Sequence, residues 1–210
     1  MRRLMFSVVL VLFTLAASAA QDTNPQPTCK NCPATYVGSE ELQDYLQWGV
    51  VSKTIDQQVR AVDVGKSHVD VAMVHRGKLD KPAPDSVAEH DLVSEVYHII
   101  DGMATLVTGP DLVDKKRRPA HQDNVRLLNG PGHGASSIRN GVTHQLKKGD
   151  VIVIPAGTGH WFTKIDDHIT YLMVRIDPDK VTPVLGEADA KASLARKKAA
   201  GKPSGQDHDH

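Results

Sequence analysis

Short apolar runs separated by glycine-containing turns are the feature that most constrains the fold of this chain. The clearest runs are residues 69–75, 96–100, 104–107, 151–154 and 169–176. Asn140-Gly141 and Gly149-Asp150 fall between such runs, and dipeptides of this kind favour tight turns between antiparallel strands. Many short strands with regular breaks are typical of a β-sandwich or β-barrel. We therefore predict an all-β domain.

The beginning of the chain has the composition of a secretory leader. Arg2 and Arg3 precede an apolar segment at residues 4–15, and small residues at 17–20 provide a cleavage site. Residues 1–20 are therefore predicted to be a signal peptide, and the protein is expected to be periplasmic or secreted. The apolar segment is shorter than the roughly 20 residues that a spanning helix needs, so we expect no stable membrane insertion.

Residues 21–38 are polar and rich in proline, which predicts an N-terminal tether. Cys29 and Cys32 lie within it, and an oxidising compartment favours a local disulfide between them. The alternative is a thioredoxin-like redox pair, which requires a helix directly after the first cysteine. The prolines around the pair argue against that helix.

The 210 residues suffice for one sizeable core once the leader is removed. We predict one barrel domain at 39–186, beginning with a short helix from Glu40 to about Trp48 that Ser39 caps. The polar tail at 187–210 is expected to be helical or disordered. Basic and acidic residues number 25 each, a balance that argues against a nucleic-acid partner.

Residues 109–135 interrupt the strand pattern with charges, glycines and prolines, which predicts a long loop. Four cations at 115–118 are consistent with guidance of an anionic substrate or with an ordinary solvated surface.

The segment from Gly149 to Phe162 ends a strand in an unusual way. A β-branched run stops at Pro155, which cannot continue a central strand, and Gly157 and Gly159 then permit a tight turn before His160. This geometry predicts an imidazole at the mouth of a barrel.

Upstream, His90 and Glu95 provide two more metal-ligand side chains. If Glu95 opens a strand, Tyr97 and Ile99 share its face, and His90 lies on the preceding strand. Two imidazoles and a carboxylate with open positions between them form a facial triad that suits a divalent transition metal. The alternative is structural, with His160 shaping a turn and Glu95 paired with Arg139 or a lysine.

These stretches resemble the paired motifs of the cupin superfamily. The second motif is matched by Gly149, Pro155, Gly157 and His160, with Lys164 where asparagine is usual. The first motif is matched by His90, Glu95 and Gly102, whereas its first histidine falls on Ala88 and its leading glycine on Pro82.

The resemblance implies a jelly-roll β-barrel that holds one divalent transition metal, with Fe, Mn, Ni and Zn all admissible. It also implies a small-molecule substrate, as in cupin oxygenases, isomerases and lyases, and pairing into homodimers. Two alternatives remain open: a non-enzymatic module that binds a small ligand, with or without a metal, and a metal-free barrel whose only role is dimerisation.

Two further residues are candidates for the site. His75 follows Val69, Val71 and Met73 on one face of a strand, so it is either a fourth metal ligand in place of Ala88 or a core histidine. Tyr97 is either a proton donor or orienting hydroxyl, or simply core filling.

Overall fold

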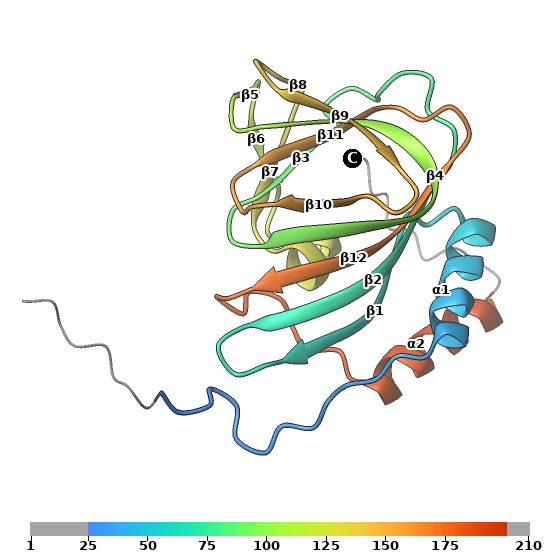
Figure 1. Cartoon of the computed structure of the whole chain (residues 1–210), viewed down its shortest axis with the longest axis vertical. Helices are drawn as coiled ribbons and strands as arrows, with labels where there is room; N and C mark the ends of the chain where they lie inside the picture. The colour runs from blue at the N-terminus through green and yellow to red at the C-terminus, as the bar shows by residue number, and fades with distance from the viewer. Residues whose placement is uncertain (1–24, 201–210) are drawn as a thin grey trace, which may run out of the picture.

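The computed structural model describes residues 25–200, so the predicted signal peptide and the last ten residues of the polar tail lie outside the described part. The elements are α1 (Ser39–Ser52), β1 (Asp56–Asp63), β2 (His68–Arg76), β3 (Val87–His90), β4 (Ser94–Gly109), β5 (Leu112–Val113), β6 (Lys116–Arg117), the π-helical turn η1 (Asn124–Asn129), β7 (Gly132–Ala135), β8 (Ser137–Ile138), β9 (Val142–Lys147), β10 (Val151–Ile154), β11 (Gly159–Lys164), β12 (Ile169–Asp177) and α2 (Glu187–Ala200). The predicted all-β jelly-roll barrel with a helix near each end is confirmed (Figure 1).

Two antiparallel layers form the barrel, and β4 belongs to both. Its first half pairs with β12 and β10, and its second half pairs with β9 and β11. The strand order runs β1-β2-β12-β4-β11-β3-β7-β6. The interior is filled by apolar and aromatic side chains from both layers, among them Val74, Ile99, Leu106, Phe162, Ile169 and Tyr171.

The bend in β4 depends on Gly102, which has φ 76°. A Cβ at this position would lie 2.1 Å from the His168 carbonyl oxygen, so only glycine fits where β12 begins beside the bend. The final glycine of the first motif therefore shapes the barrel.

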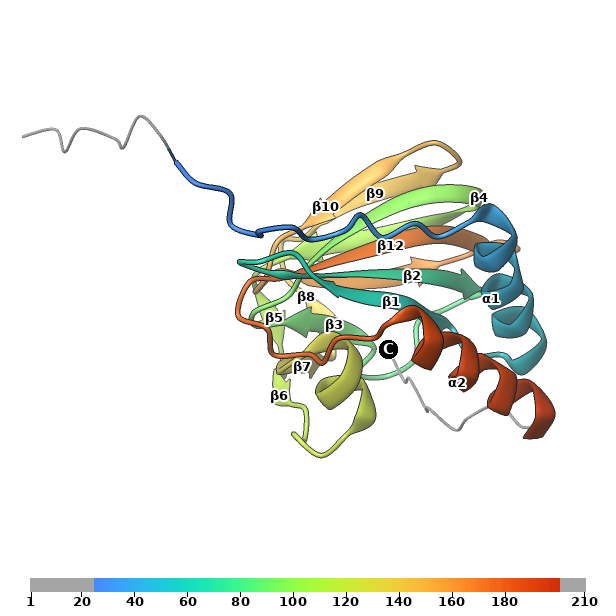
Figure 2. The same ribbon diagram turned by 90° about the horizontal axis from the view of Figure 1, so that it is seen from below.

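Helices α1 and α2 lie along the outer side of β1 and β2 (Figures 1 and 2). Tyr45 of α1 and Leu194 of α2 form an outer apolar cluster with Val59 and Met73. Helix α1 begins at Ser39. The prediction that Ser39 caps this helix was wrong, because Gly38 occupies the N-cap position and no side chain caps α1. The predicted tail thus contributes a packed helix over its described part.

The N-terminal tether covers more of this outer face. Cys29 and Cys32 are disulfide-bonded, and the segment around them borders an apolar cleft with Val69 and Val71 of β2. The side of β2 that was predicted to face inward is therefore the outer side. Ala72 and Val74, on the opposite side of the strand, lie in the barrel core.

The predicted long loop at 109–135 is only partly a loop. Its last residues form β7, which pairs with β3 in the register Glu89↔His133, and β6 pairs with β7. Glycines allow this close pairing, because a Cβ on Gly132 would lie 2.1 Å from the Glu89 carbonyl oxygen. Part of the segment is therefore barrel wall.

None of the helices within residues 25–200 combines the length and apolarity required to span a bilayer.

We predict that Gly102→Ala lowers the free energy of unfolding by more than about 2 kcal/mol, because it adds a backbone clash to the strain of a positive φ. The matched control is Gly149→Ala, since Gly149 has φ 90° but a Cβ there would meet no atom within 4 Å. Denaturant unfolding should show a loss of about 1 kcal/mol for the control. Equal losses would mean that the contact with His168 has no role.

Candidate metal centre

His90 ends β3, and its backbone is tied to the turn that follows β10. The Gly157 N–H donates a hydrogen bond of 2.7 Å to the His90 carbonyl oxygen, and Gly157 has φ 79°. The Pro155 to Gly159 turn therefore fixes the end of β3 as well as the start of β11. The imidazole itself is buried.

His160 lies on β11 directly opposite Ala88 of β3, which places both side chains at the same level of the barrel. Its Nδ1 lies 3.4 Å from the Thr158 carbonyl oxygen. A carbonyl can only accept a hydrogen bond, so this contact favours the proton on Nδ1 and leaves the lone pair on Nε2. Nε2 is the atom that faces Glu95.

Glu95 enters the barrel from the start of β4 and lies between the two imidazoles. Its carboxylate oxygens are 3.4 Å from His90 Nε2 and 3.5 Å from His160 Nε2. The ligand atoms of the three residues all lie within 4.8 Å of one another, and all three residues are buried. The structure thus brings together the three residues of the predicted triad.

Two further side chains hold the Glu95 carboxylate. The Tyr97 hydroxyl donates a hydrogen bond of 2.6 Å to Oε2, and the Arg175 Nε lies 3.4 Å from Oε1. Arg175 comes from β12 and also pairs with buried Asp56 of β1. Burial by itself raises the pKa of Glu95, but His90, His160 and Arg175 outweigh this effect and hold that pKa well below its usual value.

The protonation state of His160 is set mainly by its burial. Burial lowers the pKa of His160 to about 4, although the Glu95 charge acts in the opposite direction. His160 is therefore neutral at physiological pH, as a metal ligand must be. Arg118, from the 109–135 segment, is close enough to Glu95 that their charges interact.

This donor set fits a divalent transition metal. A neutral imidazole lone pair and an ionised carboxylate face each other in a buried space, which is unfavourable unless a cation or a proton lies between them. The His90 Nδ1 is buried and has no hydrogen-bond partner among the described residues. Two imidazoles and one carboxylate are suitable ligands for Fe, Mn, Ni and Zn.

The structure does not bring His75 to this group. Its Nδ1 lies 2.9 Å from the Thr170 Oγ1, and its ring stacks on His168 at a centroid distance of 5.6 Å. Because β2 turns the opposite face inward, His75 lies on the outside of the barrel wall. The prediction that His75 and its neighbours on the same face of β2 point into the barrel was therefore wrong.

Tyr97 combines both roles that the sequence left open. Its ring packs in the core at 4.4 Å from the Tyr171 ring centroid, and its hydroxyl is committed to Glu95. Burial raises the pKa of Tyr97 well above its usual value, and the Glu95 charge adds to this effect. The hydroxyl is therefore suited to orienting the carboxylate.

A cavity of about 220 Å³ adjoins the triad and is lined by His160, Ala88, Phe162 and Arg76. Sequence reasoning missed Arg76 and Arg175. Each arginine alternates with core residues on its own strand, Arg76 on β2 and Arg175 on β12. This could have predicted their inward orientation only if the inward face of each strand had been known.

A second group of metal-ligand side chains lies outside β3. His133 Nδ1 lies 2.7 Å from Glu89, beside Asp91, but Lys115 and Arg117 already balance these carboxylates. This group ties the 109–135 segment to the outside of β3.

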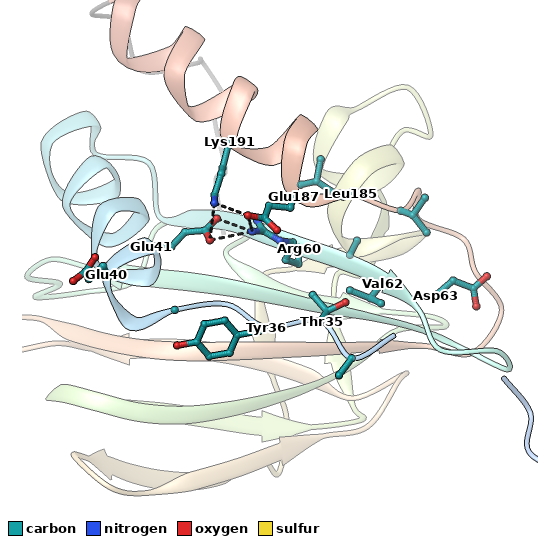
Figure 3. Close-up of a pocket in the computed structure, with 15 residues that line it drawn as sticks. Thr35, Tyr36, Glu40, Glu41, Arg60, Val62, Asp63, Leu185, Glu187 and Lys191 are labelled. Carbon is teal, nitrogen blue, oxygen red and sulfur yellow. Dashed lines mark hydrogen bonds and ion pairs between the residues drawn. The ribbon is translucent and has the colours of Figure 1, made fainter. Parts of the chain in front are cut away.

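A larger cavity of about 780 Å³ lies outside the barrel between the tether, α1, β1 and α2 (Figure 3). Four of its charged residues pair with one another: Arg60 with Glu41 at 2.8 Å, and Lys191 with Glu187 at 2.5 Å. The first pair joins α1 to β1, the second lies within α2, and Arg60 also approaches Glu187 at 4.0 Å, which links α2 to the sheet.

Residues 132–207 match the family of AraC-like ligand-binding domains, which have a cupin-type fold. The match supports a cupin-type fold and contains the second motif, whereas the first motif lies outside the matched residues. The match includes His160 but neither His90 nor Glu95. None of the curated proteins compared with the chain matches it significantly.

Solved structures resemble the chain only distantly. A protein from Bacillus halodurans is 16% identical, with 77% of this chain and 97% of that chain covered and a TM-score of 0.37. A cupin protein from Bacteroides fragilis is 15% identical, with 53% and 68% covered and a TM-score of 0.31. A DMSP lyase from Ruegeria pomeroyi is 18% identical, with 60% and 51% covered and a TM-score of 0.32.

Asp70 adds a buried titratable group near Arg175. It lies on β2 and accepts a hydrogen bond of 3.1 Å from Gln58. Burial raises its pKa from 3.8 to about 6, and the nearby Arg175 charge only partly opposes this effect.

Between about pH 4 and pH 6 the folded protein therefore keeps a proton on Asp70 that the unfolded chain releases. Ionised Asp70 opposes folding at neutral pH, and this penalty is absent below about pH 4. We predict that Asp70→Asn raises the free energy of unfolding at neutral pH by up to about 3 kcal/mol, with the gain vanishing near pH 4.

Denaturant unfolding across this pH range measures the effect, with Asp63→Asn as the control. Asp63 is exposed and bonds Lys180, which lowers its pKa, so its variant should change stability in the opposite direction. A loss of stability in Asp70→Asn at neutral pH would contradict the prediction.

Proposed function

We propose that this chain is an exported, metal-dependent cupin enzyme that acts on a small molecule, with one divalent transition metal held by His90, Glu95 and His160. The observation that carries the proposal is the arrangement around Glu95. A buried, ionised carboxylate faces the Nε2 lone pair of a neutral histidine, 3.5 Å away, with a second imidazole at 3.4 Å.

A metal in this site supplies Lewis acidity or activates oxygen, according to which metal is bound. The residues of the chain fix the ligands and control access. Tyr97 orients the Glu95 carboxylate, Arg175 keeps it ionised, and the turn at Gly157 fixes the end of β3. The cavity beside His160 gives a small molecule a path to the open side of the triad.

We predict that the protein, freed of any histidine tag, binds about one equivalent of metal after loading, and that His160→Ala loses most of it. His144→Ala is the matched control, because His144 is half-buried on β9 and contacts Thr108 at 2.9 Å, away from the triad. Elemental analysis of the folded variants gives the result. Full metal content in His160→Ala would contradict the site.

A non-enzymatic ligand-binding module is the second candidate. Ala88 supports it, because the position of the family's first histidine carries only a methyl group here. The match to ligand-binding domains also supports binding of a small molecule without requiring catalysis.

Turnover separates the two candidates. The loaded wild-type protein and His160→Ala are incubated with a panel of neutral and charged small molecules, and the products are followed by NMR. We predict conversion of at least one compound by the wild type and none by His160→Ala. Saturable binding without conversion, under every metal, would favour the binding module.

We also propose that the protein works outside the cytoplasm. The leader-like residues 1–20 and the Cys29–Cys32 disulfide support this proposal. Fractionation of cells that express the full chain should recover a shortened protein from the periplasm or medium. A full-length protein in the cytoplasm would contradict it.

Pairing into homodimers is proposed as well. Val151 and Val153, at 62% and 61% exposure, present an apolar outer face on β10, whose far edge pairs with no other strand of the described chain. Light scattering should give twice the chain mass for the wild type and less for Val153→Lys. A wild-type monomer at all concentrations would exclude pairing.

A further inference from the structure

The cavity beside the triad has a one-sided charge. Its polar lining includes the Arg76 guanidinium and the Lys78 ammonium, and no aspartate or glutamate of the described chain lines it. Ile55, Phe162 and Ile165 form apolar walls. At about 220 Å³ it is smaller than the cavities of roughly 300–1,000 Å³ that hold drug-sized ligands, so its occupant is a molecule of few atoms.

Arg76 lies in this cavity and forms no direct ion pair with a carboxylate of the described residues, although the charge of the more distant Asp56 helps to raise its pKa. Its Nε donates a hydrogen bond of 3.2 Å to the Tyr171 hydroxyl, and its Cζ lies 4.6 Å from the Phe162 ring centroid. These two contacts fix the plane of the guanidinium and leave its two terminal nitrogens without a protein acceptor in the described chain.

Arg175, which also faces the interior, is different from Arg76. Arg175 pairs with Asp56 and Glu95, so its charge is balanced within the protein. Lys78, at the cavity's rim, pairs with Asp80 at 3.1 Å on the surface. Within residues 25–200, Arg76 is therefore the cation of the cavity that is left for a ligand.

Ala88 connects Arg76 to the triad. It is buried opposite His160, and its methyl group leaves the space that an imidazole would fill. His160 and Phe162 share one face of β11, two residues apart, which corresponds to about 7 Å along the strand. Because the Arg76 guanidinium lies over Phe162, it is separated from His160 by about this distance. A molecule of a few carbon atoms spans this distance.

We propose that the cavity binds a small organic carboxylate, whose carboxylate group Arg76 holds through its two terminal nitrogens while the other end points to His160. This inference names the substrate class and rests on the proposed function for what happens at that other end. The planar fork of a guanidinium matches a carboxylate, and the apolar walls favour an organic anion over inorganic phosphate.

The test is calorimetric titration of the full mature protein with butyrate, its neutral analogue butyramide, and inorganic phosphate. We expect butyrate to bind at least about tenfold more tightly than either of the others. Arg76→Gln should weaken butyrate binding by at least about tenfold, and Arg76→Lys by less, because it keeps the charge but loses the fork.

Arg139→Gln is the matched control, since Arg139 is exposed and pairs with Asp111 outside the cavity. Ala88→Leu provides a second variant that leaves the Arg76 contacts intact. It should block the cavity and weaken butyrate binding to the same degree, while circular dichroism confirms folding of each variant.

Equal binding of butyramide, tighter binding of phosphate, or unchanged butyrate affinity in folded Arg76→Gln and Ala88→Leu would overturn the inference. Repeating the titration in metal-free His160→Ala separates it from the proposed function. Butyrate binding there, with no metal bound by the wild type, would support the carboxylate site and refute the metal site.

Discussion

The Glu95 carboxylate is the constraint around which the rest of the barrel is arranged. A negative charge inside an apolar barrel is stable only when several groups compensate it. Arg175 and Tyr97 supply two of these groups, and the metal that we propose between Glu95, His90 and His160 would supply a third. Five strands contribute to this cluster, because Arg175 in turn binds Asp56 on β1. The fold and the site therefore depend on the same interactions.

The barrel geometry explains why the triad has one open side. β3 and β11 place Ala88 against His160, and the missing imidazole leaves a cavity that reaches Arg76. His160 lines one side of this cavity, and the Arg76 guanidinium lies near Phe162. In the proposed centre, alanine at position 88 thus leaves room for a small molecule that an imidazole there would restrict.

The triad could be predicted from the sequence, because the strand at 151–154, the turn at Pro155 and Gly157, and the spacing of His90 and Glu95 are all local signals. The role of Arg76 could not. Alternation divides β2 into two faces but does not tell which face is inside, and the tether and helices cover Val69, Val71 and Met73 so that the outer face is apolar too. For that reason His75 was expected inside, whereas Arg76 lies there. The pairing of Arg175 with Glu95 joins residues distant in sequence, which no local pattern indicates.

The most direct test of the central claim is a crystal structure of the metal-loaded protein with anomalous diffraction measured at the edge of the bound metal. We predict one strong peak within about 2.0–2.3 Å of His90 Nε2, His160 Nε2 and a Glu95 oxygen, with an open position toward Ala88. A peak at the Glu89–His133 group, or an empty triad in protein that carries metal elsewhere, would contradict it.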